Sequence, residues 1–401
     1  MTKFISEQHL FKSTPAKIVM LVVDGLGGLP NPSTGKSELE TAKMPNIDKI
    51  ASNSSCGLTI PVKQGITPGS GPGHLSLFGY DPIEYPIGRG VLEGLGIGLN
   101  LAPDDIAVRG NFCTIDNNQN IVDRRASRIS SAHSKPLCDL LNQITIPNVE
   151  IEIVHVKEHR FVLLLRGQGL SHNITSNDPE EIGVPSLKID SIDANSAKTA
   201  SIVEMFIKKA NQILEGQNQA NGVLLRGFSK LPNLPSMASL YNVRAASIAA
   251  YPMYRGLTQL LGMDIKPTGS TFEDEIITLK KHYSEYDFFY IHYKPADAAG
   301  EDGDFNKKVR ALEHLDGVLP QILELNPDVF VIAGDHSTPS IMGSHSWHPV
   351  PVLIKSSLTI KQGVTGFDEK RCLNGSLGTF NAVDLMSLIL AHAGKISKFG
   401  P

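Results

Sequence analysis

The sequence DVFVIAGDHSTPSIMGSHSWHPVPVLI occupies residues 328–354 and decides the fold class. Its apolar, β-branched run at 329–333 predicts a strand buried on both faces, which is typical of a parallel sheet in an α/β protein. Asp335 and His336 follow this strand, and His345 precedes a second apolar run. Ligands collect at the carboxyl ends of parallel strands, so the stretch presents a carboxylate and two imidazoles where Zn²⁺ or Mn²⁺ can bind. Taken alone, the same residues also fit a capped turn with incidental histidines.

The composition is that of a globular protein without a nucleic-acid or membrane partner. The chain has 401 residues, of which 41% are hydrophobic and 19% charged, so it can build more than one domain with a buried core. A formal net charge of −4 gives no basis for nucleic-acid binding, and no run of ~18 apolar residues predicts a membrane span. The four cysteines form no CxxC pair and the N-terminus lacks an apolar signal segment, which favours a cytoplasmic protein with reduced thiols.

Two further strand ends also carry carboxylates. The apolar run 18–23 ends at Asp24, and the run 287–293 leads to Asp297 and Glu301. Three strand ends with carboxylates on the expected edge of one sheet, together with the two histidines, predict a metal site more strongly than any one of them alone. The glycine-rich turn after Asp24 also suggests a dinucleotide site, but GLGG lacks the GxGxxG spacing and no acidic residue ends a second strand ~20 residues later.

A glycine-rich loop, GITPGSGPG at 65–73, carries Ser70 just ahead of a helix that we expect to begin at His74. The helix dipole and the free backbone N–H groups of its first turn favour a bound phosphoryl group near that serine. Two divalent ions held at the strand ends would activate the Ser70 hydroxyl as a nucleophile. On the loop sequence alone, a solvated Gly/Ser turn is the simpler interpretation.

The middle of the chain has a different character, because arginines become frequent from about residue 107 onward. Arginine forks bind carboxylate and phosphate, and several of these arginines stand at the ends of predicted strands, although charged residues more often form a solvated face. We therefore predict an inserted α/β domain at 107–240, with 1–106 and 241–401 forming the discontinuous domain that contains the metal site. Apolar periodicity predicts helices at 41–52, 74–78, 196–214, 272–283, 306–325 and 381–394.

Several segments together resemble a known family. The segments are VVDGLGG (22–28), PGSGPGHLSLFGYDP (68–82), KPADAAGE (294–301), AGDHSTP (333–339) and SHSWHPVP (344–351), and they occur in family order. The chain resembles the cofactor-independent, that is 2,3-bisphosphoglycerate-independent, phosphoglycerate mutases of the archaeal type, within the alkaline phosphatase superfamily. The resemblance covers nearly the whole chain. Its serine and GDHSTP motifs are specific, whereas DGxG is common to many phosphatases.

The resemblance implies an alkaline-phosphatase-like, three-layer α/β domain with a mostly parallel sheet, interrupted by a smaller α/β substrate domain. It implies that Ser70 is the catalytic residue and is phosphorylated during turnover. It also implies two divalent metal ions, with Mn²⁺ expected and Mg²⁺, Co²⁺ or Zn²⁺ as alternatives, and no use of 2,3-bisphosphoglycerate. One ion would be held by Asp24, Ser70, Asp335 and His336, and the other by Asp297, residue 301 and His345.

Position 301 departs from the family pattern, which has His four residues after Asp297. Glu301 still supplies an oxygen ligand that suits Mn²⁺, although the ion preference would differ, and Asp302 is the alternative ligand. For binding the carboxylate and phosphate of the substrate, the resemblance and the arginine-rich segments suggest the following set: His74, Arg109, Arg124, Arg125, Arg128, His159, Arg160, Arg226 and Arg255.

The favoured function is an isomerase that interconverts 2-phosphoglycerate and 3-phosphoglycerate through a phosphoserine, in glycolysis and gluconeogenesis. A mutase must hold the glycerate and exclude water while Ser70 carries the phosphoryl group, and an arginine-rich inserted domain suits that task. By resemblance, His74 after the serine also favours the mutase. The alternatives on the same scaffold are a metal-dependent phosphomonoesterase and a small-metabolite kinase. A non-catalytic binding protein would require a decayed ligand set, and the ligand set is intact.

Overall fold

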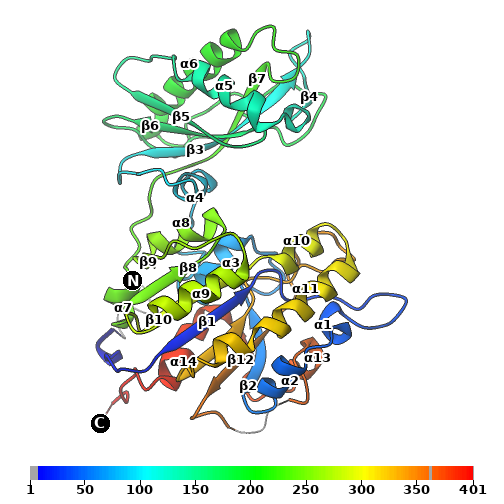
Figure 1. The fold of residues 1–401 in the computed structure, drawn as a ribbon. Coiled ribbons are helices and arrows are strands. Elements are labelled where there is room, and N and C mark those ends of the chain that lie inside the picture. The colour runs from blue at the N-terminus through cyan, green and yellow to red at the C-terminus, as the bar shows by residue number, and fades with distance from the viewer. Residues whose placement is uncertain (1–7, 361–363, 401) are drawn as a thin grey trace. The chain divides into compact units, whose positions relative to one another are not determined.

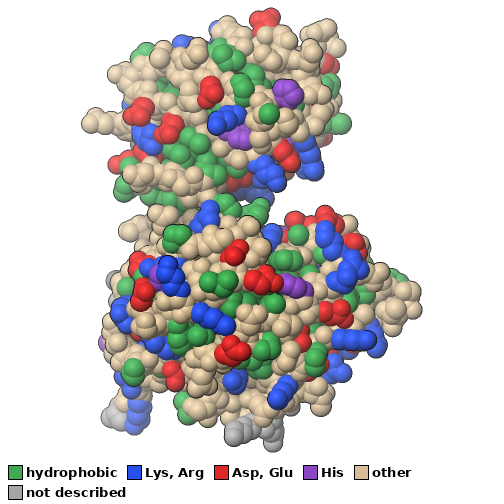
Figure 2. All heavy atoms as spheres, in the orientation of Figure 1, with side chains coloured by type: hydrophobic (Ala, Val, Ile, Leu, Met, Phe, Trp, Pro, Cys, Tyr) green, Lys and Arg blue, Asp and Glu red, His purple; other side chains and the backbone are tan. Residues whose placement is uncertain are grey.

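The computed structural model describes residues 8–360 and 364–400, and the chain divides into two compact units (Figure 1). The first unit consists of the described residues up to Pro86 and from Leu234 onward, and the second unit is Ile87–Asn233. Each unit has its own sheet and its own hydrophobic core. On the face shown in Figure 2, Lys and Arg side chains are interspersed with Asp and Glu over both units.

The boundaries of the inserted unit differ from the predicted range of 107–240, because the unit begins and ends earlier in the chain. The reason for the earlier start is helix α4 (Arg89–Gly96), which packs against strands β3 (Ile106–Ile115) and β7 (Gly222–Ser229). This contact is close, since a Cβ on Gly90 would lie 2.2 Å from the carbonyl oxygen of residue 107. The helix therefore belongs to the inserted unit.

The sheet of the first unit has eight strands in the described part of the chain. Their order across the sheet is β13 (Gly378–Asn381), β2 (Ser55–Ile60), β12 (Val350–Ser356), β11 (Val329–Ala333), β1 (Ile18–Val23), β10 (Phe288–Tyr293), β8 (Ala245–Ile248) and β9 (Asp264–Ile265). Among these strands, β12 alone runs antiparallel to its neighbours, which confirms the α/β class with a mostly parallel sheet. Strands β1, β10 and β11 are adjacent and buried along their whole length.

Helices cover both faces of this sheet (Figure 1). They are η1 (Gln8–Leu10), α1 (Glu38–Thr41), α2 (Pro45–Ala51), α3 (Ser70–Leu77), α7 (Met237–Tyr241), α8 (Pro252–Leu260), α9 (Phe272–His282), α10 (Pro295–Glu301), α11 (Phe305–Val318), α12 (Pro320–Leu323), α13 (Glu369–Leu373), η4 (Ala382–Asp384) and α14 (Leu385–His392). The odd-numbered residues of β1 share one core with α2, α9, α11 and α12. The even-numbered residues are equally buried and face the opposite layer, where α14 contacts β11. The unit is therefore a three-layer α/β/α structure.

The sheet of the second unit is antiparallel. Besides β3 and β7 it contains β4 (Ile121–Asp123), β5 (Glu150–Lys157) and β6 (Arg160–Arg166), and its helices are η2 (Ala126–Arg128), α5 (Ser131–Leu141), η3 (Ala194–Ser196) and α6 (Ala197–Ile213), in addition to α4. On β3, Ile106 and Val108 share a core with α5 and α6. Successive side chains of a strand point to opposite faces, so Arg109 and Asn111 point to the side of α4.

Two predicted helices differ from the structure. The helix predicted at 306–325 is divided into α11 and α12, because Pro320 lacks the N–H group that would continue the first helix and instead begins the second. The C-terminal helix predicted at 381–394 begins only at Leu385, after β13 and a short 3₁₀ turn. Within the described residues, each helix is too short or too polar to cross a membrane.

Candidate metal centre and anion-binding cluster

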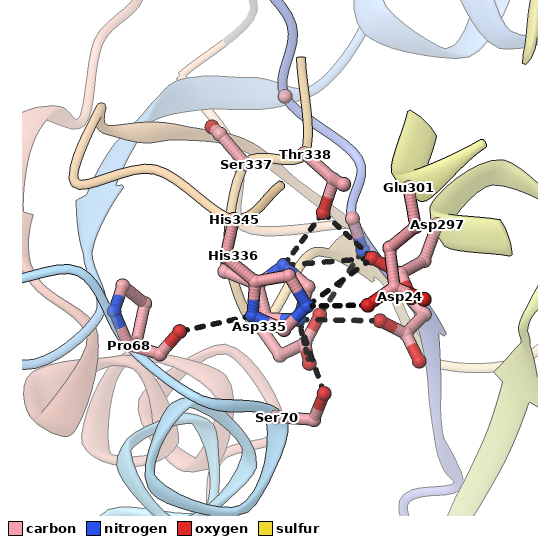
Figure 3. A network of polar contacts seen from close by, with 12 residues as sticks. Asp24, Pro68, Ser70, Asp297, Glu301, Asp335, His336, Ser337, Thr338 and His345 are labelled. Carbon is pink, nitrogen blue, oxygen red and sulfur yellow. Dashed lines mark hydrogen bonds and ion pairs between the residues drawn. The ribbon is translucent and has the colours of Figure 1, made fainter. Parts of the chain in front are cut away.

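Three carboxylates from distant parts of the chain lie together at one edge of the first unit's sheet (Figure 3). Asp24 follows β1, Asp335 follows β11 after one glycine, and Asp297 lies in α10, directly after β10. These strands are adjacent and parallel, so their carboxyl ends share an edge. All three side chains are fully buried.

Glycines allow these segments to approach one another closely. A Cβ on Gly73 of α3 would lie 2.2 Å from the carbonyl oxygen of Asp335, and a Cβ on Gly25 would lie 2.6 Å from Oγ1 of Thr338. Gly25 also has a φ of +65°, which residues with a side chain rarely adopt. The DGLGG and PGSGPG segments therefore need glycine for packing around the carboxylates. This packing explains the glycine-rich turn after Asp24 without a dinucleotide site.

Two groups of side chains have ligand atoms within 4.8 Å of one another, and His336 belongs to both. In the first group, Nε2 of His336 lies 3.4 Å from Oδ1 of Asp24 and 3.1 Å from Oδ2 of Asp335. In the second group, Nε2 of His345 lies 3.6 Å from Oδ1 of Asp297, and the two imidazole rings stack with centroids 3.6 Å apart. The family resemblance implies that His336 binds the first ion alone, whereas in the structure the residue belongs to both groups.

The donor atoms of these groups fit divalent cations. Oδ1 of Asp24 and Oδ2 of Asp335 are buried, and although imidazole nitrogens lie near them, neither oxygen accepts a well-aligned hydrogen bond from the described residues. A buried carboxylate oxygen without a donor is costly unless a cation lies beside it. Carboxylate oxygens combined with imidazole nitrogens are the ligands that Mn²⁺ and Zn²⁺ take in proteins.

The electrostatics keep the Asp24 and Asp335 carboxylates ionised. Burial and a neighbouring carboxylate raise the pKa of Asp24, but a hydrogen bond from His292 and the charge of Lys294 outweigh them and hold it at about 2. Burial also raises the pKa of Asp335, yet the neighbouring His336 lowers it well below its usual value. Burial lowers the pKa of His336, and the surrounding carboxylates more than reverse this effect and raise it to about 9. The site therefore carries the negative charge that a cation requires.

Ser70 is the first residue of α3, with Gly69 as its N-cap, rather than part of the loop ahead of the helix. The helix begins earlier than predicted because the glycines and Pro72 occupy its first turn, where the missing N–H group of proline costs nothing. The Ser70 side chain is half-buried, and its Oγ lies 3.2 Å from Nε2 of His336 (Figure 3). The hydroxyl thus stands at a helix N-terminus and beside both groups of candidate ligands.

His74, which is predicted to bind substrate, lies against Asp335 in the structure. Its side chain is fully buried, and Nδ1 lies 2.9 Å from the carbonyl oxygen of Ser70 and 3.2 Å from Oδ2 of Asp335. The ring therefore contacts a candidate metal ligand from behind. Its position supports a role in orienting Asp335 and α3.

The contacts of His345 distinguish Glu301 from Asp302 as candidate metal ligands. Nδ1 of His345 donates to the carbonyl oxygen of Pro68 at 3.0 Å, which leaves Nε2 free toward the second group. Oε1 of Glu301 lies 3.5 Å from this Nε2, whereas Oδ2 of Asp302 forms an ion pair with Lys307 at 2.7 Å. The geometry therefore favours Glu301 over Asp302 as a ligand.

Four side chains that were not predicted from the sequence also contact the carboxylates: Tyr254, His292, Lys294 and Thr338. Oδ2 of Asp24 accepts from the Tyr254 hydroxyl, from Nε2 of His292 at 3.2 Å and from Nζ of Lys294 at 2.9 Å. Lys294 also donates to Oδ2 of Asp297 at 2.6 Å. Lys294 and Thr338 stand inside the KPADAAGE and AGDHSTP segments, so their place in the chain was a usable signal. The sequence around Tyr254 in α8 gave no such signal.

The second unit carries a cluster of basic side chains on the α4 side of its sheet. Arg109 on β3 lies opposite Arg226 on β7, and Asn111 lies opposite Arg160 on β6, so all four share one face. Nη1 of Arg109 pairs with Oε1 of Glu93 at 3.1 Å. The Nε atoms of the three arginines are buried without a hydrogen-bond acceptor among the described residues. Nη1 of Arg226 pairs with Oε1 of Glu180 at 3.2 Å, so carboxylates already contact two of the three arginines. The unused Nε donors remain available for a small anion.

The remaining arginines of the second unit have different surroundings. Nε and Nη2 of Arg124 donate to the two carboxylate oxygens of Asp178, each at 2.9 Å, so this fork is occupied. Arg125 and Arg128 are exposed, at a turn in which Ala126–Arg128 have φ values of 47°, 50° and 53°. Three successive left-handed residues are costly, and such strain is common at functional sites.

His159 and Arg255 complete the predicted set. His159 precedes β6, and burial together with the charge of Arg160 lowers its pKa to about 4, so the ring is neutral at physiological pH. Arg255 lies in α8 of the first unit, where its Nη1 donates to the carbonyl oxygen of Ala250 at 3.3 Å. The predicted substrate set is therefore divided, because Arg109, Arg160, Arg226 and His159 are in the second unit and Arg255 is not.

Comparison with known proteins agrees with the resemblance found in the sequence. A family profile described as 2,3-bisphosphoglycerate-independent phosphoglycerate mutase matches residues 51–220. A protein of Thermotoga petrophila named probable 2,3-bisphosphoglycerate-independent phosphoglycerate mutase is 49% identical over 400 residues, which is 99% of this chain and 98% of the relative. A protein of Thermus thermophilus with the same name is 45% identical over 398 residues, which is 98% of each.

Solved structures share the fold. Protein PH0037 of Pyrococcus horikoshii matches with a TM-score of 0.83 and 28% identity, over 97% of this chain and 100% of that chain. The cofactor-independent phosphoglycerate mutase of Thermoplasma acidophilum matches with a TM-score of 0.72 and 29% identity, over 94% and 100%. Because relatives that are 45% and 49% identical span nearly the whole length, the chain belongs to the family of 2,3-bisphosphoglycerate-independent phosphoglycerate mutases.

Proposed function

We propose that this protein interconverts 2-phosphoglycerate and 3-phosphoglycerate, and that Ser70 carries the phosphoryl group between the two positions. The observation that carries the proposal is the position of the Ser70 hydroxyl. Its Oγ stands at the N-terminus of α3, 3.2 Å from Nε2 of His336, which belongs to both groups of candidate metal ligands. The names of the two full-length relatives support the same activity.

The reaction consists of two phosphoryl transfers on one glycerate molecule. Oγ of Ser70 attacks the phosphorus, the bond from phosphorus to the C3 oxygen breaks, and the serine proton ends on that oxygen. The C2 hydroxyl of the same glycerate then attacks the phosphoserine, Oγ of Ser70 leaves, and it recovers a proton from the C2 hydroxyl. When bound, two divalent cations would stabilise the serine alkoxide and the charge on the phosphoryl oxygens. Water takes no part, and no phosphate is released.

The residues around Ser70 suit a phosphorylated serine. The amide groups of Ser70 and Gly71 are in the first turn of α3 and have no helical acceptor, so they can donate to phosphoryl oxygens, and the helix dipole adds to the attraction. Nζ of Lys294 adds positive charge beside Asp24 and Asp297. These groups would stabilise the phosphoserine while the glycerate turns.

The basic cluster of the second unit is our candidate for binding the substrate's carboxylate. Arg109, Arg160 and Arg226 have buried Nε donors without acceptors among the described residues, although Arg109 pairs with Glu93 and Arg226 with Glu180 through Nη1. A mutase needs such contacts more than a phosphatase does, because the glycerate must remain bound between the two transfers. We assign this unit to substrate binding for that reason.

We further propose that the ions are Mn²⁺, since oxygen ligands predominate, and that the protein serves glycolysis and gluconeogenesis in the cytoplasm. One ion would be held by Asp24, Ser70, Asp335 and His336, and the other by Asp297, Glu301 and His345, with His336 close to both.

The decisive experiment supplies 3-phosphoglycerate to the purified protein and couples the product to enolase. We expect turnover with Mn²⁺, none after chelation, and no requirement for 2,3-bisphosphoglycerate or a nucleotide. Inorganic phosphate is measured in parallel. Release of phosphate in proportion to substrate consumed would make the protein a phosphomonoesterase, and a strict need for ATP would make it a kinase.

A further inference from the structure

Thr338 is the point at which the two groups of candidate metal ligands meet. Its side chain is fully buried. Oγ1 donates to Oδ1 of Asp297 at 2.6 Å and lies 2.9 Å from Nδ1 of His336 (Figure 3). Asp297 belongs only to the second group, whereas His336 belongs to both. One hydroxyl therefore contacts both a carboxylate ligand and the shared imidazole.

The direction of these hydrogen bonds fixes the proton on His336. A hydroxyl has one hydrogen, and a carboxylate oxygen can only accept, so the hydrogen of Thr338 points to Asp297. The lone pair of the hydroxyl then faces Nδ1 of His336, which must carry a ring proton. Nε2 is the atom near Ser70 and Asp335, so a cation bound there would displace the second proton of the ring and leave the neutral tautomer with its proton on Nδ1.

Thr338 is itself held in place by its backbone. Its N–H donates to the carbonyl oxygen of Gly27 at 3.0 Å. Nζ of Lys308 is fully buried and donates to the carbonyl oxygens of Thr338 at 2.8 Å and Gly27 at 2.9 Å. A Cβ on Gly300 of α10 would lie 2.3 Å from the Thr338 carbonyl oxygen, so the helix that carries Asp297 packs against the same residue. The segments that carry Asp24 and Asp297 therefore both pack against Thr338, which itself follows Asp335 and His336 in the chain.

We infer that Thr338 is a positioning residue whose hydroxyl sets the tautomer of His336 and supports the binding of both divalent ions. The inference rests on the proposed two-ion site. It goes further in stating that both ions depend on the same hydroxyl, so that loss of this hydroxyl weakens the two together. A threonine that merely filled space would leave ion affinity unchanged when replaced by a side chain of the same shape.

The test compares Thr338→Val, which keeps the shape and removes the hydroxyl, with Thr338→Ser, which keeps the hydroxyl. Each protein is stripped with a chelator, and its binding of Mn²⁺ alone is measured by titration calorimetry. The absorption spectrum with Co²⁺ reports the geometry around the ion. We expect the valine variant to bind both ions roughly 10- to 100-fold more weakly, with an altered Co²⁺ spectrum, and the serine variant to approach the parent.

Thr278→Val is the matched control. Oγ1 of Thr278 bonds to Oγ1 of Thr268 at 3.1 Å in the same unit, away from the carboxylates, so its loss should lower stability without changing ion affinity. Thr338→Ala is measured in parallel in case the valine variant does not fold. Unchanged affinity for both ions in Thr338→Val or in Thr338→Ala overturns the inference. Weaker binding of one ion alone in these variants overturns it as well. Failure of the parent protein to bind two ions overturns the two-ion site itself.

Discussion

The candidate metal centre of the first unit and the basic cluster of the second unit are opposites in charge and in origin. The metal centre gathers three fully buried carboxylates from the ends of three parallel strands, and each of them is contacted by an imidazole or by Lys294. The basic cluster gathers arginines across antiparallel strands and leaves their Nε donors unused. The net charge of −4 hides this contrast. The metal centre therefore suits cations, and the basic cluster suits a small anion.

The largest effect is expected at Ser70, the proposed nucleophile. Ser70→Ala should reduce mutase activity on the order of 10⁴-fold or more, because a covalent intermediate is removed rather than weakened. The measurement is the enolase-coupled rate, together with transfer of labelled phosphoryl from substrate to protein. Ser76→Ala is the control on the same helix, since the buried Ser76 hydroxyl has no hydrogen-bond partner among the described residues. Substantial turnover by Ser70→Ala would remove the phosphoserine from the mechanism.

The basic cluster should respond differently, through substrate binding. Arg160→Met should raise KM for phosphoglycerate roughly 10- to 100-fold, because a charge-assisted hydrogen bond is lost, while Mn²⁺ content stays the same. Steady-state kinetics and metal analysis of the same preparation test both statements. Arg244→Met serves as the control, because Arg244 is an exposed residue of the first unit that pairs with Asp287. Loss of bound metal in the Arg160 variant would contradict the assignment of metal binding to the first unit and substrate binding to the second.

A smaller effect is expected at the edge of the metal centre. Glu301→Ala should weaken one ion roughly tenfold or more and leave the other in place, since Glu301 is half-exposed and near the second group alone. Asp302→Ala removes only an exposed ion pair with Lys307 and should bind both ions normally. Metal content per chain, measured for the two variants side by side, decides between them. Two ions in the Glu301 variant and one in the Asp302 variant would reverse the assignment.

The smallest effect concerns stability and pH. Glu275 of α9 accepts the backbone N–H groups of Ala250 and His292, and burial raises its pKa from 4.5 to about 8 although those hydrogen bonds oppose the rise. Between these values the folded state holds a proton that the unfolded chain has released, so this group makes the metal-free protein less stable as pH rises from 4.5 to 8. Glu275→Gln should flatten that dependence in denaturant titrations. The control is Glu324→Gln on the surface, and an equal slope in both variants would contradict the prediction.

The sheet and its carboxylate-bearing edge could be predicted because they leave local patterns. Apolar runs such as 18–23 and 329–333 identify buried strands, and the residue after each strand must lie at the edge of the sheet. Helix ends were less predictable where a single residue determines them, as at Pro320. The start of α3 at Ser70 was missed because its first turn is rich in glycine, which is typical of a loop.

The second layer of the site could not be predicted, because it depends on tertiary contacts. Tyr254 reaches Asp24 from a helix far away in the chain, and nothing in its neighbours indicates this. Arg109 and Arg226 become one cluster only through the register of β3 with β7. Conversely, His74 stood in the right motif, but burial determines that it faces Asp335. Sequence patterns predict which segments meet, whereas side-chain orientation follows from packing.

The central position of β1 has a consequence for how the protein is made. Its two partner strands begin at Phe288 and Val329, so the apolar run of β1 leaves the ribosome long before either partner exists. The second unit, which is continuous from Ile87 to Asn233, can fold during this delay. An unpaired strand of six apolar residues is prone to associate with other chains. Pairing between strands that are far apart in the sequence also forms slowly. The yield of folded protein should therefore depend on chaperones that shield β1 until the C-terminal half has been synthesised.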